Sequence, residues 1–123
     1  MLIEPNVIVL YADNLKITSQ FYQDLLKIKP EEASPTFHSF KLSNGMELAL
    51  KAKHSVEPPI EGKSGCLELA FTLDSQYHVD ALFAKWQSQE INIIFPPSIV
   101  PYGYTFVALD PDGNRLRVAS LKN

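Results

Sequence analysis

The stretch Asp110-Pro111-Asp112-Gly113-Asn114-Arg115-Leu116 decides the fold of this chain, because it joins a tight turn to the start of a strand. Aspartate, proline and glycine are residues that β-turns favour, so the first four residues predict a turn. The apolar and β-branched runs at 104–109 and 116–121 predict strands on either side of it. A similar turn signal at 43–45, Ser-Asn-Gly, separates two further predicted strands, 37–42 and 46–53.

The turns belong to a pattern that occurs twice along the chain. An apolar strand at 2–11 is followed by the capping pair Asp13-Asn14 and a helix at 15–27. A strand at 66–73 is followed by Asp74-Ser75 and a second helix, and Asp13 and Asp74 are 61 positions apart. The matched order of strand, cap, helix and glycine turn favours a duplication over the alternative of a chance repeat of a common strand–helix–strand order.

The apolar faces of the two helices are expected to lie against sheets. Helical spacing relates Ile17, Phe21, Leu25 and Ile28 in the first helix, and Val79, Leu82, Phe83 and Trp86 in the second. The segment 54–64 holds Pro58, Pro59 and Gly62 and is expected to be a linker. The second copy is seven residues longer, and Pro96-Pro97 predicts that these residues form a loop after a strand at 91–95.

Composition and charge exclude several classes of protein. The chain has 123 residues and a mass of 13.8 kDa. Of its residues, 46% are apolar and 20% are charged, and this length and composition are typical of a single globular domain. A net charge of −3 gives no basic surface for nucleic acid or an anionic membrane. A lone cysteine excludes an intramolecular disulfide and a cysteine-cluster metal site, and no signal peptide or membrane span is predicted. A cytoplasmic protein is therefore expected.

Three segments together resemble the vicinal-oxygen-chelate superfamily, also called glyoxalase/bleomycin-resistance/dioxygenase. They are the first strand with Asp13, the helix motif Phe21-Tyr22-Gln23-Asp24-Leu25-Leu26, and the Asp110-Pro111-Asp112-Gly113-Asn114 turn. The resemblance implies an α+β fold of two tandem βαβββ modules, whose curved mixed sheets enclose a cavity. It makes 1–123 one domain, with module 1 at about 1–54, a linker at 55–64 and module 2 at about 65–123.

Strand alternation then predicts which side chains face the cavity. Leu116 and Val118 suit the helix side of the last strand, which directs Arg115 and Arg117 into the cavity. In the other strands the residues expected to face the cavity are Asn6, Ile8, Leu10, Glu47, Ala49, Lys51, Glu68, Ala70 and Thr72, whereas Val7 and Val9 are expected to pack under a helix.

The resemblance places a metal ligand at one inward position on each of four strands in the family's metal enzymes. Asn6 holds the first position, Glu47 or Ala49 the second, Glu68 the third and Arg117 the fourth, and the internal repeat favours Ala49 over Glu47. Arginine is always cationic and offers no lone pair to a metal. We therefore expect no metal, no cofactor and no catalytic residue.

Glu68 and Arg117 are expected to form a pair inside the cavity. A guanidinium and a carboxylate can meet through two hydrogen bonds, and two readings of such a pair remain open. Either the two residues only neutralise each other, or Glu68 orients Arg117 to bind an anionic group of a ligand. Tyr102, Tyr104 and Phe106 are candidate stacking surfaces for a planar ligand, although aromatic residues in strands more often belong to the core.

Among metal-free relatives, the likeness extends to the phenazine-antibiotic-resistance proteins of this superfamily. It covers Phe21-Tyr22, Asp80-Ala81-Leu82-Phe83, Gly103-Tyr104-Thr105-Phe106, and the last turn followed by Arg117. It implies a homodimeric protein that sequesters a planar aromatic compound, a carboxylic acid bound between aromatic side chains. The predicted ligand-binding residues are Asn6, Glu47, Glu68, Tyr102, Tyr104, Phe106 and Arg117. The alternative is a metal-dependent lyase or dioxygenase with degenerate ligands.

Overall fold

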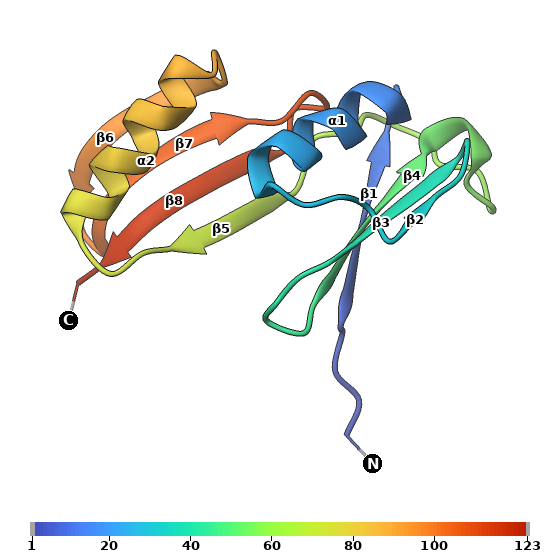
Figure 1. Cartoon of the computed structure of the whole chain (residues 1–123), viewed down its shortest axis with the longest axis horizontal. Helices are drawn as coiled ribbons and strands as arrows, with labels where there is room; N and C mark the ends of the chain where they lie inside the picture. Colours follow the sequence, from blue (N-terminus) through green and yellow to red (C-terminus); the bar gives the residue numbers. More distant parts are fainter. Residues whose placement is uncertain (1, 123) are drawn as a thin grey trace. The chain divides into compact units, whose positions relative to one another are not determined.

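A computed structural model describes residues 2–122, and the chain divides into two compact units between Ser64 and Gly65. Each unit has the order strand, helix, three strands (Figure 1). The elements of the first unit are β1 (Val7–Ala12), α1 (Leu15–Leu26), β2 (Glu32–Ala33), β3 (Phe37–Lys41), β4 (Glu47–Ala52) and the 3₁₀ turn η1 (Lys53–Ser55). Those of the second unit are β5 (Glu68–Thr72), α2 (Gln76–Ser88), β6 (Asn92–Val100), β7 (Gly103–Leu109) and β8 (Arg115–Leu121).

The two units share one sheet topology, which confirms the predicted α+β fold of two βαβββ modules. The strand orders are β1-β4-β3-β2 and β5-β8-β7-β6. In each sheet the first strand pairs parallel with the last, and the remaining neighbours are antiparallel. The parallel pair needs a crossover, which the helix and the intervening strands supply.

Each helix begins at a polar cap. Asn14 accepts a hydrogen bond from the backbone N–H of Ile17 at 3.2 Å, and Ser75 accepts one from that of His78 at 3.3 Å. The caps are therefore Asn14 and Ser75, the residues that follow Asp13 and Asp74. The two caps are as far apart in the sequence as the two aspartates. Both helices are short, and among residues 2–122 no helix is long and apolar enough to cross a membrane.

The buried stripe of α1 differs from the one that hydrophobicity predicted. Leu15, Thr18, Ser19 and Tyr22 are buried, whereas Ile17 is 57% exposed. Small polar residues let the helix approach its sheet, and Ser19 Oγ meets Nδ1 of His38 on β3 at 2.5 Å. The expectation that Ile17 faces the core is therefore wrong.

The buried stripe of α2 contains two of the predicted core residues. Val79 and Trp86 are buried against the second sheet. Trp86 contacts Phe71 of β5 and Phe106 of β7 edge-on, with ring centroids 5.8 and 5.4 Å apart.

We name the face of each sheet away from its helix the open face.

Burial and register correct the predicted facing of the first strand. Leu10 is buried and pairs with buried Leu50 of β4, whereas Val7 and Val9 are 42% and 46% exposed. Parallel neighbours in register share a face, so Ile8 and Leu10 lie with the helix-side residues of β4. The expectation that Val7 and Val9 pack under the helix is wrong, and these valines share the open face with Glu47 and Ala49.

Candidate binding site on the second sheet

The last strand presents its two arginines on the open face, as alternation predicts. Leu116 and Val118 are fully buried, while Arg115 is exposed and Arg117 is half-buried. On the neighbouring strand β5, Leu69 and Phe71 are half-buried on the helix side, and Glu68, Ala70 and Thr72 are exposed. The prediction that Glu68, Arg115 and Arg117 share one face of this sheet is confirmed.

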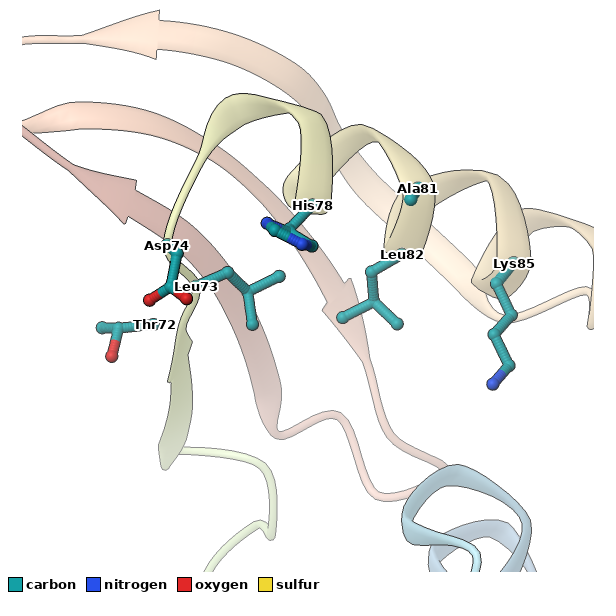
Figure 2. Close-up of a pocket in the computed structure, with 7 residues that line it drawn as sticks. All are labelled: Thr72, Leu73, Asp74, His78, Ala81, Leu82 and Lys85. Atoms are coloured by element: carbon teal, nitrogen blue, oxygen red, sulfur yellow. The ribbon is translucent and has the colours of Figure 1, made fainter.

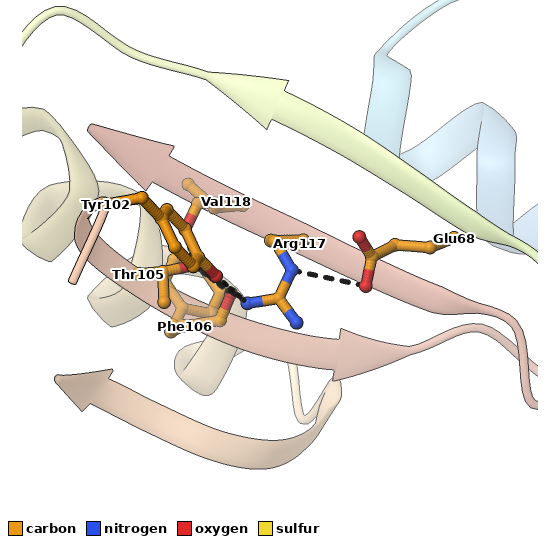
Figure 3. Close-up of polar contacts among 6 residues, drawn as sticks. All are labelled: Glu68, Tyr102, Thr105, Phe106, Arg117 and Val118. Carbon is orange, nitrogen blue, oxygen red and sulfur yellow. Dashed lines mark hydrogen bonds and ion pairs between the residues drawn. The ribbon is translucent and has the colours of Figure 1, made fainter. Parts of the chain in front are cut away.

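Arg117 lies at the centre of a small polar network. Its Nε is 3.2 Å from Oε1 of Glu68, and its Nη1 donates a 2.7 Å hydrogen bond to the hydroxyl of Tyr102. A longer contact of 3.5 Å joins Nη1 to Oγ1 of Thr105. Figure 3 shows the guanidinium between Glu68 and Tyr102, with a terminal nitrogen directed away from both partners.

A hollow of about 370 Å³ lies beside this network, and Tyr102 and Arg117 line it. We name it the arginine hollow, and its lining residues are Ile94, Phe95, Val100, Tyr102, Val107, Arg115 and Arg117. It combines two aromatic rings, aliphatic side chains and two guanidinium groups. Such a lining suits an aromatic molecule that carries a small number of polar or anionic groups.

A β-bulge directs Phe95 into the hollow. Ile93 pairs with Ala108, but Phe95 pairs with Val107, so β6 carries one extra residue opposite β7 at this point. Without the bulge, Phe95 would fall opposite Phe106 and face α2. With it, Phe95, Val107 and Arg117 lie in one row across three strands.

The second copy's extra residues extend a strand rather than forming the predicted loop. β6 runs from Asn92 to Val100 and includes Pro96 and Pro97. Two features tolerate these prolines: β6 is the edge strand of its sheet, and a second register shift falls between Phe95 and Ser98. The two prolines therefore indicate a bulged edge strand, which positions Phe95. Assigning this segment to a loop overlooked that meaning of the prolines.

Phe106 lies on the opposite face from Arg117, contrary to expectation. It is fully buried, and its ring contacts Phe83 and Trp86 of α2 at centroid distances of 5.4 Å. It pairs with Val118, and residues directly opposite in an antiparallel pair share a face. Phe106 is therefore a core residue, not a stacking surface beside Arg117.

Tyr104 also lies on the helix side. Its hydroxyl donates a 2.6 Å hydrogen bond to Oδ1 of Asp80 on α2. The hydrogen bond to Asp80, burial and the negative charge of Asp80 all raise the pKa of Tyr104 above its ordinary value. Of the three predicted aromatic residues, only Tyr102 lies at the arginine hollow.

The remaining two predicted residues belong to the first unit. Asn6 is exposed and precedes β1, and its carbonyl accepts a 3.0 Å hydrogen bond from the backbone N–H of Glu47. Glu47 begins β4 and is half-buried on the open face of the first sheet. The structure thus places Asn6 beside Glu47, while Glu68, Tyr102 and Arg117 come together in the second unit.

The motif at 110–114 positions the strands that carry this site. Asp110 is buried, and its Oδ1 accepts the backbone N–H groups of Asp112 and Asn114, both at 2.9 Å. The side chain of Asn114 bonds to the other oxygen of Asp110 at 2.9 Å and accepts the backbone N–H of Leu67 at 3.3 Å. The turn is therefore tied to the start of β5, which aligns Glu68 beside the arginines of β8.

The donors on the second sheet do not fit a divalent metal ion. The carboxylate of Glu68 pairs with Arg117, whose cationic side chain offers no lone pair. Among residues 2–122, no group of three or more His, Cys, Asp or Glu side chains is placed to hold a metal ion. The chemistry that this arrangement supports is recognition of an anion or a hydrogen-bond acceptor beside flat apolar surface.

A second hollow, of about 460 Å³, lies between α2 and the end of β5 (Figure 2). Its lining residues are Thr72, Leu73, Asp74, His78, Ala81, Leu82 and Lys85. It contains charges of both signs and no phenyl, phenol or indole ring. The arginine hollow is therefore the better candidate for a planar aromatic molecule.

The chain is similar to known proteins over nearly its whole length. Phenazine antibiotic resistance protein EhpR of Enterobacter agglomerans is 30% identical over 122 residues, which cover 97% of this chain and 93% of that protein. A solution structure of a protein from Agrobacterium tumefaciens is 40% identical with a TM-score of 0.86, covering 99% of this chain and 100% of that one.

A further likeness shows the fold alone. A glyoxalase/bleomycin resistance protein/dioxygenase from Nocardioides is 18% identical, with a TM-score of 0.85 over 98% of this chain and 86% of that one.

The family model for the Glyoxalase/Bleomycin resistance protein/Dioxygenase superfamily matches residues 5–118. The chain therefore belongs to the Glyoxalase/Bleomycin resistance protein/Dioxygenase superfamily.

Proposed function

We propose that this protein binds and sequesters a planar aromatic, antibiotic-like compound without using a metal ion. One observation carries the proposal: the rings of Phe95 and Tyr102 line the same hollow as Arg117, whose Nε pairs with Glu68. Flat apolar surface recognises an aromatic ring system, and guanidinium groups recognise its polar substituents.

The similarity to EhpR supports the class of ligand. The name of that protein links it to resistance against a phenazine antibiotic, and phenazine is a planar fused aromatic system. Sequestration rather than conversion is proposed because Arg117 holds the strand position where the family's metal enzymes carry a ligand, and because Glu68 is already paired.

The test is calorimetric titration of the metal-free protein with phenazine-1-carboxylate, followed by recovery of the compound. We expect saturable binding and chemically unchanged compound. Replacing Phe95 by Ala should weaken binding about two- to tenfold, because an aromatic contact contributes about 0.5–1.5 kcal/mol beyond its buried area. The matched control is Ile99→Ala on the same strand, whose side chain is 79% exposed and does not line the hollow.

Three results would overturn the proposal. They are no binding to the metal-free protein, conversion of the compound, and equal affinities for wild type and Phe95→Ala. If stoichiometric zinc or nickel proves necessary for turnover, the chain is instead a metal-dependent lyase or dioxygenase.

A further inference from the structure

Both arginines of the chain lie at one hollow. The 123 residues contain nine lysines but only two arginines, Arg115 and Arg117, and both line the arginine hollow. They are separated by one residue on β8, so they project from the same face of the strand. Guanidinium differs from ammonium in presenting a planar fork of donors that matches a carboxylate.

The two arginines differ in how their charge is balanced. Glu68 lies beside Arg115 in the strand register, yet its carboxylate pairs with Arg117. Within residues 2–122, Arg115 forms no salt bridge with a carboxylate. The negative charge of Glu68 thus offsets the positive charge of Arg117. The positive charge of Arg115 is not offset in this way.

Strand register also places the arginines along the hollow. Arg115 pairs with Leu109, which in turn pairs with Asn92 near the beginning of β6. Phe95, Val107 and Arg117 form the next row of the open face, and Val100 pairs with Gly103 beyond it. The hollow therefore has an uncompensated cation at one end, and flat and aliphatic surface along the rest.

We infer that Arg115 binds the carboxylate of a singly charged planar aromatic acid, while Arg117 is a positioning residue that holds Tyr102 at the hollow. This inference rests on the proposed function and narrows its ligand class. Arg117 is bonded to Glu68 through Nε and to Tyr102 through Nη1, whereas Arg115 is an exposed residue that forms no salt bridge among residues 2–122. The residual charge selects a monoanion over a neutral amide of the same shape.

The experiment compares phenazine-1-carboxylate with phenazine-1-carboxamide by calorimetry at one ionic strength. We expect the wild type to prefer the acid, and Arg115→Gln to weaken the acid about ten- to a hundredfold while changing the amide less than about twofold. Arg115→Lys should recover part of the loss, because it restores the charge without the planar fork. Lys85→Gln, on the helix that covers the other face of this sheet, is the matched control for loss of one positive charge and should leave both affinities unchanged.

The possible outcomes separate this inference from the proposed function. Binding of both compounds with no effect of Arg115→Gln on the acid would overturn the inference and leave the proposed function standing. An equal loss for Arg115→Gln and Lys85→Gln would show that only overall charge matters and would also overturn it. Binding of neither compound by the wild type would overturn both.

Discussion

Four aromatic residues of the second unit are divided between the two faces of one sheet. Phe95 and Tyr102 line the arginine hollow, while Tyr104 bonds to Asp80 and Phe106 packs under α2. Residue type alone does not distinguish the two pairs, because an aromatic ring suits a core as well as a binding surface. The hydrogen bond to Asp80 makes Tyr104 a link between β7 and α2, with a consequence for stability at high pH.

Tyr104 is predicted to stabilise the fold only up to alkaline pH. Its pKa in the folded protein lies above the ordinary value of 10.0, so its contribution to the free energy of unfolding is complete below pH 10 and is lost as pH rises through the folded-state pKa. Urea unfolding of wild type and Tyr104→Phe should therefore differ by a constant amount below pH 10 and by a shrinking amount above it.

The partner residue supplies the control for this prediction. In Asp80→Asn the hydrogen bond from Tyr104 to a carboxylate is lost, and so is the negative charge that disfavours tyrosinate. Ultraviolet titration should therefore show the pKa of Tyr104 moving back toward 10.0. Identical titrations of wild type and Asp80→Asn would contradict the role assigned to Asp80.

At the scale of elements, two local irregularities build the site. The bulge in β6 turns Phe95 onto the open face, and the Asp110–Asn114 turn ties β8 to the start of β5. The turn also meets the chain at Gly65, where an added Cβ would lie 2.5 Å from the carbonyl oxygen of Asp112. Close backbone packing at Gly65 thus accompanies the hydrogen bond from Leu67 to Asn114.

Gly65→Ala is predicted to destabilise the protein more than Gly62→Ala. The two glycines have nearly equal positive φ angles, +93° and +96°, so alanine is strained at both by about 1–2 kcal/mol. Only Gly65 adds a backbone clash, since nothing lies within 4 Å of a Cβ at Gly62. The free energy of unfolding should fall about 1–3 kcal/mol further in Gly65→Ala, measured by urea denaturation, and equal losses would contradict the proposed packing.

At the scale of the whole molecule, duplication leaves each unit with an open sheet face and two edge strands. In the second sheet the edge strand β6 exposes Ile94, Phe95 and Ile99, the last at 79%. Exposed apolar edge strands favour association with another chain unless they are covered. Association with a second copy of the chain would cover these side chains.

We predict a homodimer in solution. Light scattering at tens of micromolar should give twice the chain mass of 13.8 kDa, and Ile99→Asp should shift the population toward monomer by placing a charge on the β6 edge. Ile17→Asp, on the exposed side of α1, is a comparison at a second exposed isoleucine. A single species of 13.8 kDa for the wild type would contradict the prediction.

The sequence by itself determined the repeated strand–helix–strand order and both helix starts to within one residue. It also determined that Arg115 and Arg117 lie on the opposite face of the last strand from Leu116 and Val118. These properties follow from local rules: turn and cap residues act over a few positions, and strand alternation has a period of two. The pairing of Glu68 with Arg117 followed instead from the resemblance, because the fold that it implies puts their two strands side by side. The turn at 110–114 was identifiable because its side chains bond mainly within the turn itself.

Only the tertiary structure decided which of two faces each strand presents and which aromatic residues reach the site. Alternation divides β1 into two sets, but helix packing alone shows that Leu10, not Val9, is buried. One extra residue in β6 reverses the facing of Phe95, and pairing with Val118 assigns Phe106 to the core. Cross-strand register joins residues far apart in the chain, and a shift of one residue exchanges the two faces, so no local pattern contains this information.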